Sequence, residues 1–228
     1  MKILGIDTSG KVASVAVSDG GVLLWEQSVY TKLTHSQVIM PMVRRAMEDT
    51  GIGFDELNCV AVANGPGSYT GLRIGIGAVK GLCMGAPMLK CAGVSTLKAL
   101  AYNCCAFEGR IIAVMRARPG IVYAAEFDAE DGKITRASPD RVCAEEELFG
   151  DYKCVRPIML VGDWAGEVRK TYFDGRNGVR KAEFTELLQR AGSLCLAVES
   201  EPELICGPEE LEVSYLQATK AEKDKAHS

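Results

Sequence analysis

Short apolar runs, each ended by turn residues, open both halves of the chain. Residues 2–7 are apolar, residues 12–17 alternate with a period of two, and residues 22–30 continue after a further turn. Such runs predict three successive β-strands. The same order of runs and turns recurs over residues 111–137. The recurrence predicts an internal duplication, in which two half-molecules each begin with a three-stranded meander and continue into βα units.

Between the two meanders the apolar spacing changes to that of helices. Apolar residues three and four apart predict a helix over residues 36–50, with Thr34 or Ser36 as its cap. A buried strand is expected next, followed by a glycine-rich helix over residues 69–85. The other predicted elements are strands at 57–63, 88–92 and 157–161, a turn at 116–120, and helices at 95–105, 144–149 and 183–198.

Composition indicates an ordinary globular chain of 228 residues, with 47% hydrophobic and 25% charged residues. We expect two halves, residues 1–107 and 108–228, that pack along a cleft. The formal net charge of -4 argues against a protein that grips nucleic acid alone. No signal-like segment or apolar run of the ~20 residues that a membrane helix needs is present, so we expect a cytoplasmic protein without a membrane segment.

Nine cysteines occur without a CxxC pair. Cys59, Cys83, Cys91 and Cys195 lie inside apolar runs, as small buried side chains do. We interpret these thiols as core residues, because the spacing of metal ligands is absent and an odd count suits a reducing compartment.

The glycine-rich helix carries five glycines between residues 71 and 85, each unfavourable by about 1 kcal/mol relative to alanine. With the preceding turn they form two rows of i, i+4 spacing, Gly67-Gly71-Gly75 and Gly77-Gly81-Gly85. One row can rest on the half-molecule's own sheet, and the other is free to receive a second helix. The alternative is that the helices here only cover their own sheet.

The turn after the first strand reads Asp7-Thr8-Ser9-Gly10. In a duplicated fold such a hairpin can cradle a phosphate, with the aspartate orienting a hydrated metal; equally, Asp and Ser can satisfy the backbone of an ordinary turn. The corresponding turn of the second half carries Arg116, which repels Mg²⁺ although it can pair with phosphate. We therefore expect no metal-dependent hydrolysis here, while anion binding stays open.

Histidine supply limits the chemistry further. The chain has only His35 and His227, and no GxSxG, HExxH, Walker-type or GxGxxG motif in strand-to-helix context. We expect no metal site and no activated serine, and Ser68 is interpreted as a helix cap. The start of that helix, with Arg73 one turn in, could hold an anion.

Five segments together resemble the TsaB (YeaZ) family over about the first 125 residues, and the rest of the chain more loosely. They are Asp7-Thr8-Ser9, His35-Ser36-Gln37, GPGSYTGLRIG at 65–75, GVSTL at 93–97, and the hairpin Arg118…Gly120…Val122-Tyr123. The resemblance implies a duplicated α/β fold of the actin-like ATPase type (sugar kinase/Hsp70/actin, ribonuclease H-like). It also implies a non-catalytic subunit in the synthesis of N6-threonylcarbamoyladenosine at position 37 of tRNA.

The resemblance implies specific partners as well. Catalysis would belong to a TsaD-type transferase, whose metal histidines fall where this chain has residues 93–97. A TsaE-type ATPase would join the assembly, tRNA would be contacted only indirectly, and the chain alone would form a homodimer. The first two helices would form the interface, and the chain would carry no cofactor. The expected interface residues are Ile39, Met40, Val43, Met47, Tyr69, Leu72, Arg73, Ile76, Gly77, Lys80 and Met84, and Asp7, Thr8 and Ser9 would be a vestigial phosphate hairpin.

Two departures from the family pattern stand out. Arg116 replaces the usual acid of the second hairpin, and a PxYLR-like segment near the carboxyl terminus reads Val213-Ser214-Tyr215-Leu216-Gln217. Three alternatives stay open: an actin-like ATPase, a glycoprotease-like hydrolase, and a homodimeric binding protein with no role in tRNA.

Overall fold

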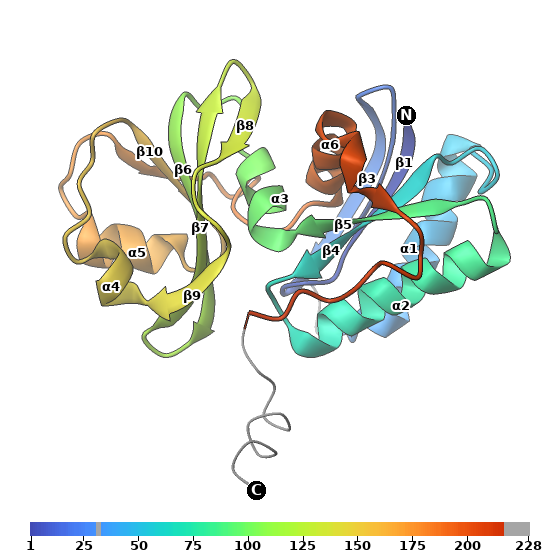
Figure 1. Ribbon diagram of the computed structural model, residues 1–228, viewed down its shortest axis with the longest axis horizontal. Coiled ribbons are helices and arrows are strands. Elements are labelled where there is room, and N and C mark those ends of the chain that lie inside the picture. The colour runs from blue at the N-terminus through green and yellow to red at the C-terminus, as the bar shows by residue number, and fades with distance from the viewer. Residues whose placement is uncertain (31–32, 217–228) are drawn as a thin grey trace, which may run out of the picture.

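The computed structural model describes residues 1–30 and 33–216 and has the duplicated α/β architecture expected from the sequence (Figure 1). The first run of elements is β1 (Lys2–Asp7), β2 (Val12–Asp19), β3 (Val22–Tyr30), α1 (His35–Thr50), β4 (Cys59–Gly65), α2 (Tyr69–Gly85), β5 (Lys90–Ser95) and α3 (Thr96–Tyr102). The second is β6 (Gly109–Arg118), β7 (Ile121–Glu130), β8 (Lys133–Arg136), β9 (Arg141–Ala144), α4 (Glu145–Phe149), β10 (Ile158–Val161), α5 (Ala165–Tyr172) and β11 (Val179–Lys181). The chain then returns through α6 (Ala191–Ser200), the 3₁₀ turn Pro202–Leu204 and β12 (Ile205–Cys206).

The strand orders confirm the predicted duplication. The first sheet has the order β12-β5-β4-β1-β2-β3 and the second β11-β10-β6-β7-β8, with β9 paired to β7. In each half the opening strand lies between an antiparallel hairpin partner and a parallel strand that arrives later in the chain. The sequence elements β1-β2-β3-β4-β5 therefore correspond to β6-β7-β8-β10-β11.

Helices separate and cover the two sheets (Figure 1). Helices α1 and α2 cover one face of the first sheet, with a continuous apolar core between them and the strands. Helices α3 and α6 cover the other face, and their core also includes side chains of the second sheet. The outer face of the second sheet packs against α4 and α5. The layer of α3 and α6 thus joins the halves.

Local capping chemistry explains where the first two helices begin. The side chain of Gln37 accepts a bond from the backbone N–H of Thr34 at 3.0 Å, as in a capping box. Helix α1 starts directly after Thr34, at His35. Ser68 Oγ accepts a bond from Gly71 N at 3.2 Å, and α2 starts at Tyr69. Both predicted starts are confirmed to within a residue.

The prediction of an amphipathic helix over residues 183–198 is wrong for its first half, because α6 begins only at Ala191. Residues 183–190 cross between the halves, and their carbonyl groups serve other elements. Asn103 Nδ2 donates to the carbonyl oxygens of Glu186 and Leu188, and Gly162 N donates to that of Leu187. Phe184, expected in the apolar face, is 85% exposed. The turn expected at 116–120 is also shorter, since β6 continues to Arg118.

The carboxyl-terminal return differs from the expected division at residues 107 and 108. Strand β12 joins the first sheet, where Ile205 pairs with Ala92 and Cys206 with Cys91. Helix α6 packs on β1 and β2, so residues 191–216 lie with the first half. Within the described ranges, no helix combines the length and apolar character needed to cross a bilayer.

Candidate functional site

The turn after β1 reaches the cleft between the halves but directs its aspartate inward. Asp7 is fully buried, and its Oδ1 accepts bonds from Ser9 N at 2.8 Å and Ser9 Oγ at 2.6 Å. Burial raises the pKa of Asp7 to about 6, although the two bonds from Ser9 act in the opposite direction. Its Oδ2 has no hydrogen-bond partner within residues 1–30 and 33–216. The carboxyl group therefore serves the turn itself.

Helix α2 packs closely against this turn, and the first glycine row allows the close approach. Thr8 Oγ1 donates to Gly71 O at 2.8 Å, and Ser68 N donates to Ser9 O at 2.7 Å. A methyl group at Gly71 would collide with the carbonyl oxygen of Thr8, and one at Gly75 would collide with Thr8 Oγ1. Only glycine permits this approach, so the prediction that one row packs within the half-molecule is confirmed.

The cleft holds a hollow of about 310 Å³. Ser9, Lys11 and Ser68 line one side, and Arg116 and Asp163 line the other. Asp163 Oδ1 accepts a bond from the backbone N–H of Arg116 at 3.0 Å, while the Arg116 guanidinium lies 4.8 Å from the centre of the Trp164 ring. Lys11 and Asp163 were not among the site residues expected from the sequence. Both directly follow glycines in turns at strand ends, which was the signal that could have identified them.

These residues do not match the ligand set of a metal-dependent nucleotide site. One oxygen of Asp7 is already held by Ser9, and Arg116 stands across the hollow. Among the residues described, no group of three or more His, Cys, Asp or Glu side chains could hold a metal ion. The polar groups of the hollow suit an anion better than a cation.

The expected partner surface divides into two groups. Five side chains are buried: Leu72, together with Ile39, Val43, Met47 and Ile76, which belong to the core between α1, α2 and the first sheet. In the free chain these five side chains are therefore not available on the outer surface, and their place in a partner interface stays a prediction. The others lie on the outside or are half-buried: Met40, Tyr69, Arg73, Gly77, Lys80 and Met84.

The second glycine row leaves one side of α2 smooth and open. A methyl group added at Gly77, Gly81 or Gly85 would meet no atom within 4 Å of it. Met84 is 85% exposed beside this row, and Met88 just after the helix is 89% exposed. Two exposed methionines beside a helix side that carries only glycines are typical of a surface that a partner covers.

The carboxyl-terminal return ends against the start of the same helix. The Tyr215 ring stacks on Tyr69 with centroids 5.2 Å apart, and its hydroxyl accepts a bond from Arg73 Nε at 3.0 Å. The Arg73 guanidinium also lies 4.1 Å from the centre of the Tyr69 ring. The segment that departs from the PxYLR pattern therefore still contacts α2 through Tyr215. Gln217 and His227 lie outside the described residues.

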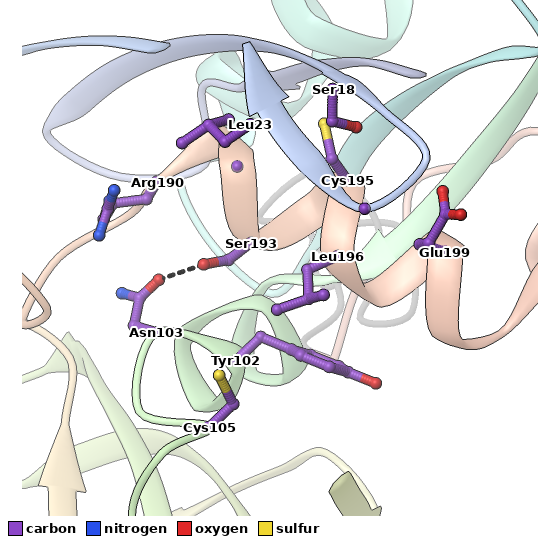
Figure 2. A pocket seen from close by; sticks show the side chains of 12 residues that line it. Ser18, Leu23, Tyr102, Asn103, Cys105, Arg190, Ser193, Cys195, Leu196 and Glu199 are labelled. Carbon is purple, nitrogen blue, oxygen red and sulfur yellow. Dashed lines mark hydrogen bonds between the residues drawn. The ribbon is translucent and has the colours of Figure 1, made fainter. Parts of the chain in front are cut away.

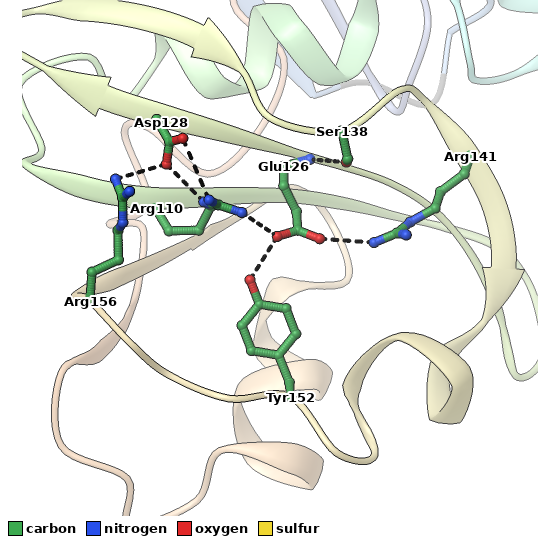
Figure 3. A network of polar contacts seen from close by, with 7 residues as sticks. All are labelled: Arg110, Glu126, Asp128, Ser138, Arg141, Tyr152 and Arg156. Atoms are coloured by element: carbon green, nitrogen blue, oxygen red, sulfur yellow. Dashed lines mark hydrogen bonds and ion pairs between the residues drawn. The ribbon is translucent and has the colours of Figure 1, made fainter.

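Two further polar features have structural roles. A hollow of about 240 Å³ lies beside α6, where Ser193 Oγ donates to Asn103 Oδ1 at 2.6 Å (Figure 2). On the second sheet, Glu126 accepts bonds from Arg110, Arg141 and Tyr152 (Figure 3). These bonds hold β6 and β7 to the segment after α4, because the cations and the carboxylate satisfy one another.

Comparisons with known proteins agree with this architecture. Residues 29–165 match the model of a family described as "TsaD: tRNA N6-adenosine threonylcarbamoyltransferase". The tRNA threonylcarbamoyladenosine biosynthesis protein TsaB of Escherichia coli is 34% identical over 168 residues, which are 72% of this chain and 69% of that protein. The chain belongs to the TsaB family. TsaB of Bacillus subtilis is 35% identical over 163 residues, 71% of each chain.

Solved structures extend the likeness to nearly the whole of this chain. YeaZ from Pseudomonas aeruginosa superposes with a TM-score of 0.78 at 26% identity, covering 94% of this chain and 99% of that one. Component A of (R)-2-hydroxyglutaryl-CoA dehydratase from Acidaminococcus fermentans, at 11% identity and a TM-score of 0.51, shares the fold over 89% of this chain and 99% of its own. The expected TsaB family and the duplicated actin-like fold are both confirmed.

Proposed function

We propose that this chain is a non-catalytic subunit in the synthesis of N6-threonylcarbamoyladenosine at position 37 of tRNA, and that it supports a TsaD-type transferase. Membership of a family named for tRNA threonylcarbamoyladenosine biosynthesis supports the pathway. The match to a TsaD family model supports the kinship with the transferase, which is the basis for pairing two similar folds. A TsaE-type ATPase would join this pair, and tRNA would be contacted indirectly.

The open row of Gly77, Gly81 and Gly85 is the observation that carries the docking role. Glycine lowers the intrinsic stability of a helix. A row of glycines that contacts nothing in its own chain is therefore best explained by contact with another protein. Because this side of α2 lacks side-chain bulk, a second helix can approach the α2 backbone closely. The exposed Met84 and Met40 can fill irregular gaps beside that helix. In the absence of the transferase, a second copy could occupy the same face.

The cleft supports a role without catalysis. The Asp7 carboxyl group is buried and bonded to Ser9, and Arg116 lies across the hollow from that turn. A phosphoryl-transfer site needs ligands for metal ions that neutralise phosphate charge, and this combination does not supply them. The chain therefore acts through binding in this proposal, and the transferase supplies the chemistry.

The test is Gly77→Leu, assayed by calorimetry with a purified TsaD-type transferase. The new side chain would project from the open side of α2, so we expect binding at least tenfold weaker, since a filled groove removes the close helix contact. Folding should persist, because leucine favours helix over glycine. Unchanged affinity would rule out this face.

The matched control is Gly166→Leu. Gly166 is an exposed glycine in α5 of the second half, where only the Lys181 side chain approaches an added methyl group, at 3.8 Å. This variant changes helix propensity and surface area in the same way but leaves α2 intact. It should bind the transferase as the unmodified chain does.

The actin-like ATPase is retained as a second candidate because Lys11, Ser68 and Arg116 line the hollow of the cleft. Hydroxyl and cationic groups in that arrangement can hold a phosphate without metal. Incubation of the isolated chain with ATP and Mg²⁺, with free phosphate measured over time, separates the two functions, since a docking subunit should give no turnover and an ATPase should release phosphate.

A further inference from the structure

Two thiols face each other across the pairing of β5 and β12. Cys91 and Cys206 are direct partners in this antiparallel ladder, so their side chains point to the same face of the sheet. Their Sγ atoms are 3.9 Å apart. Opposed residues in antiparallel strands have Cα atoms about 4.5–5.5 Å apart, which lies within the range of about 4.4–6.8 Å that disulfides span. A small rotation of the side chains would bring the sulfur atoms to bonding distance.

Only one of the two thiols can be reached from solvent. Cys91 is completely buried, whereas Cys206 is half-buried and lines a hollow of about 380 Å³ beside the carboxyl-terminal return. Glu210 and Glu212 line the same hollow. Their negative charge disfavours an anionic oxidant such as glutathione disulfide, so a small neutral molecule is the reagent that this entrance suits.

We propose that Cys91 and Cys206 form a redox-active pair that closes to an intrachain disulfide when a hydroperoxide enters this hollow. The Cys206 thiolate attacks one peroxide oxygen, the O–O bond breaks, and hydroxide leaves with the thiol proton as water. The resulting sulfenic acid is attacked by the Cys91 sulfur, which forms the S–S bond and expels hydroxide, and this hydroxide takes the Cys91 proton. Two thiols are oxidised by two electrons, and hydrogen peroxide is reduced to two water molecules.

The order of the two steps follows from the surroundings of each sulfur. Burial raises the pKa of Cys91 to about 12, so that thiol stays protonated and is a poor first nucleophile at neutral pH. Cys206 meets the oxidant first because it opens to the hollow. A third thiol, Cys83, lies on the buried face of α2, where its Sγ is 4.0 Å from Lys90 O and its side chain also interacts with Cys91. Cys83 is not a strand partner of either thiol and is only 4% exposed, so the peroxide does not reach it first.

The bond would fasten the carboxyl-terminal return to the first sheet. From Cys206 the return continues through Leu211, which is 2% exposed, to Tyr215 on the start of α2. Linking residues so far apart in sequence restricts the unfolded chain strongly, which stabilises the folded one. Oxidation would therefore hold the segment over 207–216 in place beside the Tyr69–Arg73 end of α2.

The experiment treats the native full-length chain with hydrogen peroxide, alkylates the remaining thiols, and maps peptides by mass spectrometry without reduction. We expect the Cys91 and Cys206 peptides to appear joined, two hydrogens lighter than their sum, and to separate with dithiothreitol. The melting temperature of the oxidised chain should rise by roughly 5–15 °C.

Matched variants make the assignment specific. Cys206→Ser should abolish the joined peptides and the rise in melting temperature, while Cys83→Ser should leave both unchanged. Circular dichroism before oxidation establishes that each variant is folded. Thiols that stay unmodified, a link that uses Cys83 instead, or Cys206 oxidised to sulfinic acid without a link would each overturn the proposal.

Discussion

The Asp7 carboxyl group ends β1 in a fully buried position, where one oxygen accepts both available bonds from Ser9. Sequence reasoning left two roles open for this residue, a phosphate hairpin and an ordinary turn. The bonds to Ser9 are those of the ordinary turn. The second oxygen, without a partner among the described residues, makes the ionised form unfavourable.

Asp7→Asn tests this at the scale of one residue. The pKa of Asp7 is raised from 3.8 to about 6 in the folded chain, so between these values the folded state holds a proton that the unfolded state has released. The free energy of unfolding therefore falls as pH rises from about 4 to about 6, and this contribution is constant above pH 6. Removing the charge should raise the free energy of unfolding at pH 8 by up to about 3 kcal/mol.

Urea denaturation at pH 4.5 and pH 8 measures the effect. The exposed Asp55→Asn serves as the control and should keep the pH dependence of the unmodified chain. If Asp7→Asn leaves the difference between the two pH values unchanged, Asp7 is not the group responsible.

At the scale of the element, α2 combines two opposite uses of glycine in one helix. The row of Gly67, Gly71 and Gly75 allows close approach to the turn after β1, whereas the row that begins at Gly77 contacts nothing in the chain. The spacing in the sequence was sufficient to separate the two rows. It could not show whether the apolar residues of α1 face the sheet or a partner, because helical periodicity is the same in both cases; the structure buries Ile39, Met42, Val43, Ala46 and Met47.

Paired alanine substitutions measure the two rows separately. Gly71→Ala should lower the free energy of unfolding by about 3 kcal/mol, because the methyl group would collide with the backbone oxygen of Thr8, which cannot move aside cheaply. Gly77→Ala should raise it by about 1 kcal/mol, since alanine favours helix and the position is open. Chemical denaturation of both variants provides the measurement. Equal effects in the same direction would contradict this division of α2.

At the scale of the whole molecule, the crossing segment 183–190 connects the second half to the return on the first sheet. Asn103, just after α3, donates to the carbonyl oxygens of Glu186 at 2.6 Å and Leu188 at 2.8 Å, and it accepts a bond from Ser193. Asn103 thus helps to fix the path between the halves, together with Gly162 N, which donates to Leu187 O. The local sequence of 183–190 favours helix, but tertiary hydrogen bonds from distant residues override that preference.

Asn103→Ala should therefore destabilise the chain by about 2–4 kcal/mol, because it leaves two carbonyl groups and one hydroxyl without these partners. Hydrogen exchange should quicken in the crossing segment and in the first turn of α6. The exposed Asn177→Ala in the second half is the control and should change stability by less than about 0.5 kcal/mol. Unaltered exchange in Asn103→Ala would show that other contacts hold the crossing.

The sequence by itself determined the duplication, most strands, the starts of α1, α2 and α3, and the open glycine row, because periodicity and caps depend on residues close together in the chain. Only the tertiary structure decided the burial of Val43 and Leu72, the return of residues 191–216 to the first sheet, and the facing thiols of Cys91 and Cys206. These features depend on contacts between residues far apart in sequence, and no local pattern encodes which distant side chain will be the neighbour.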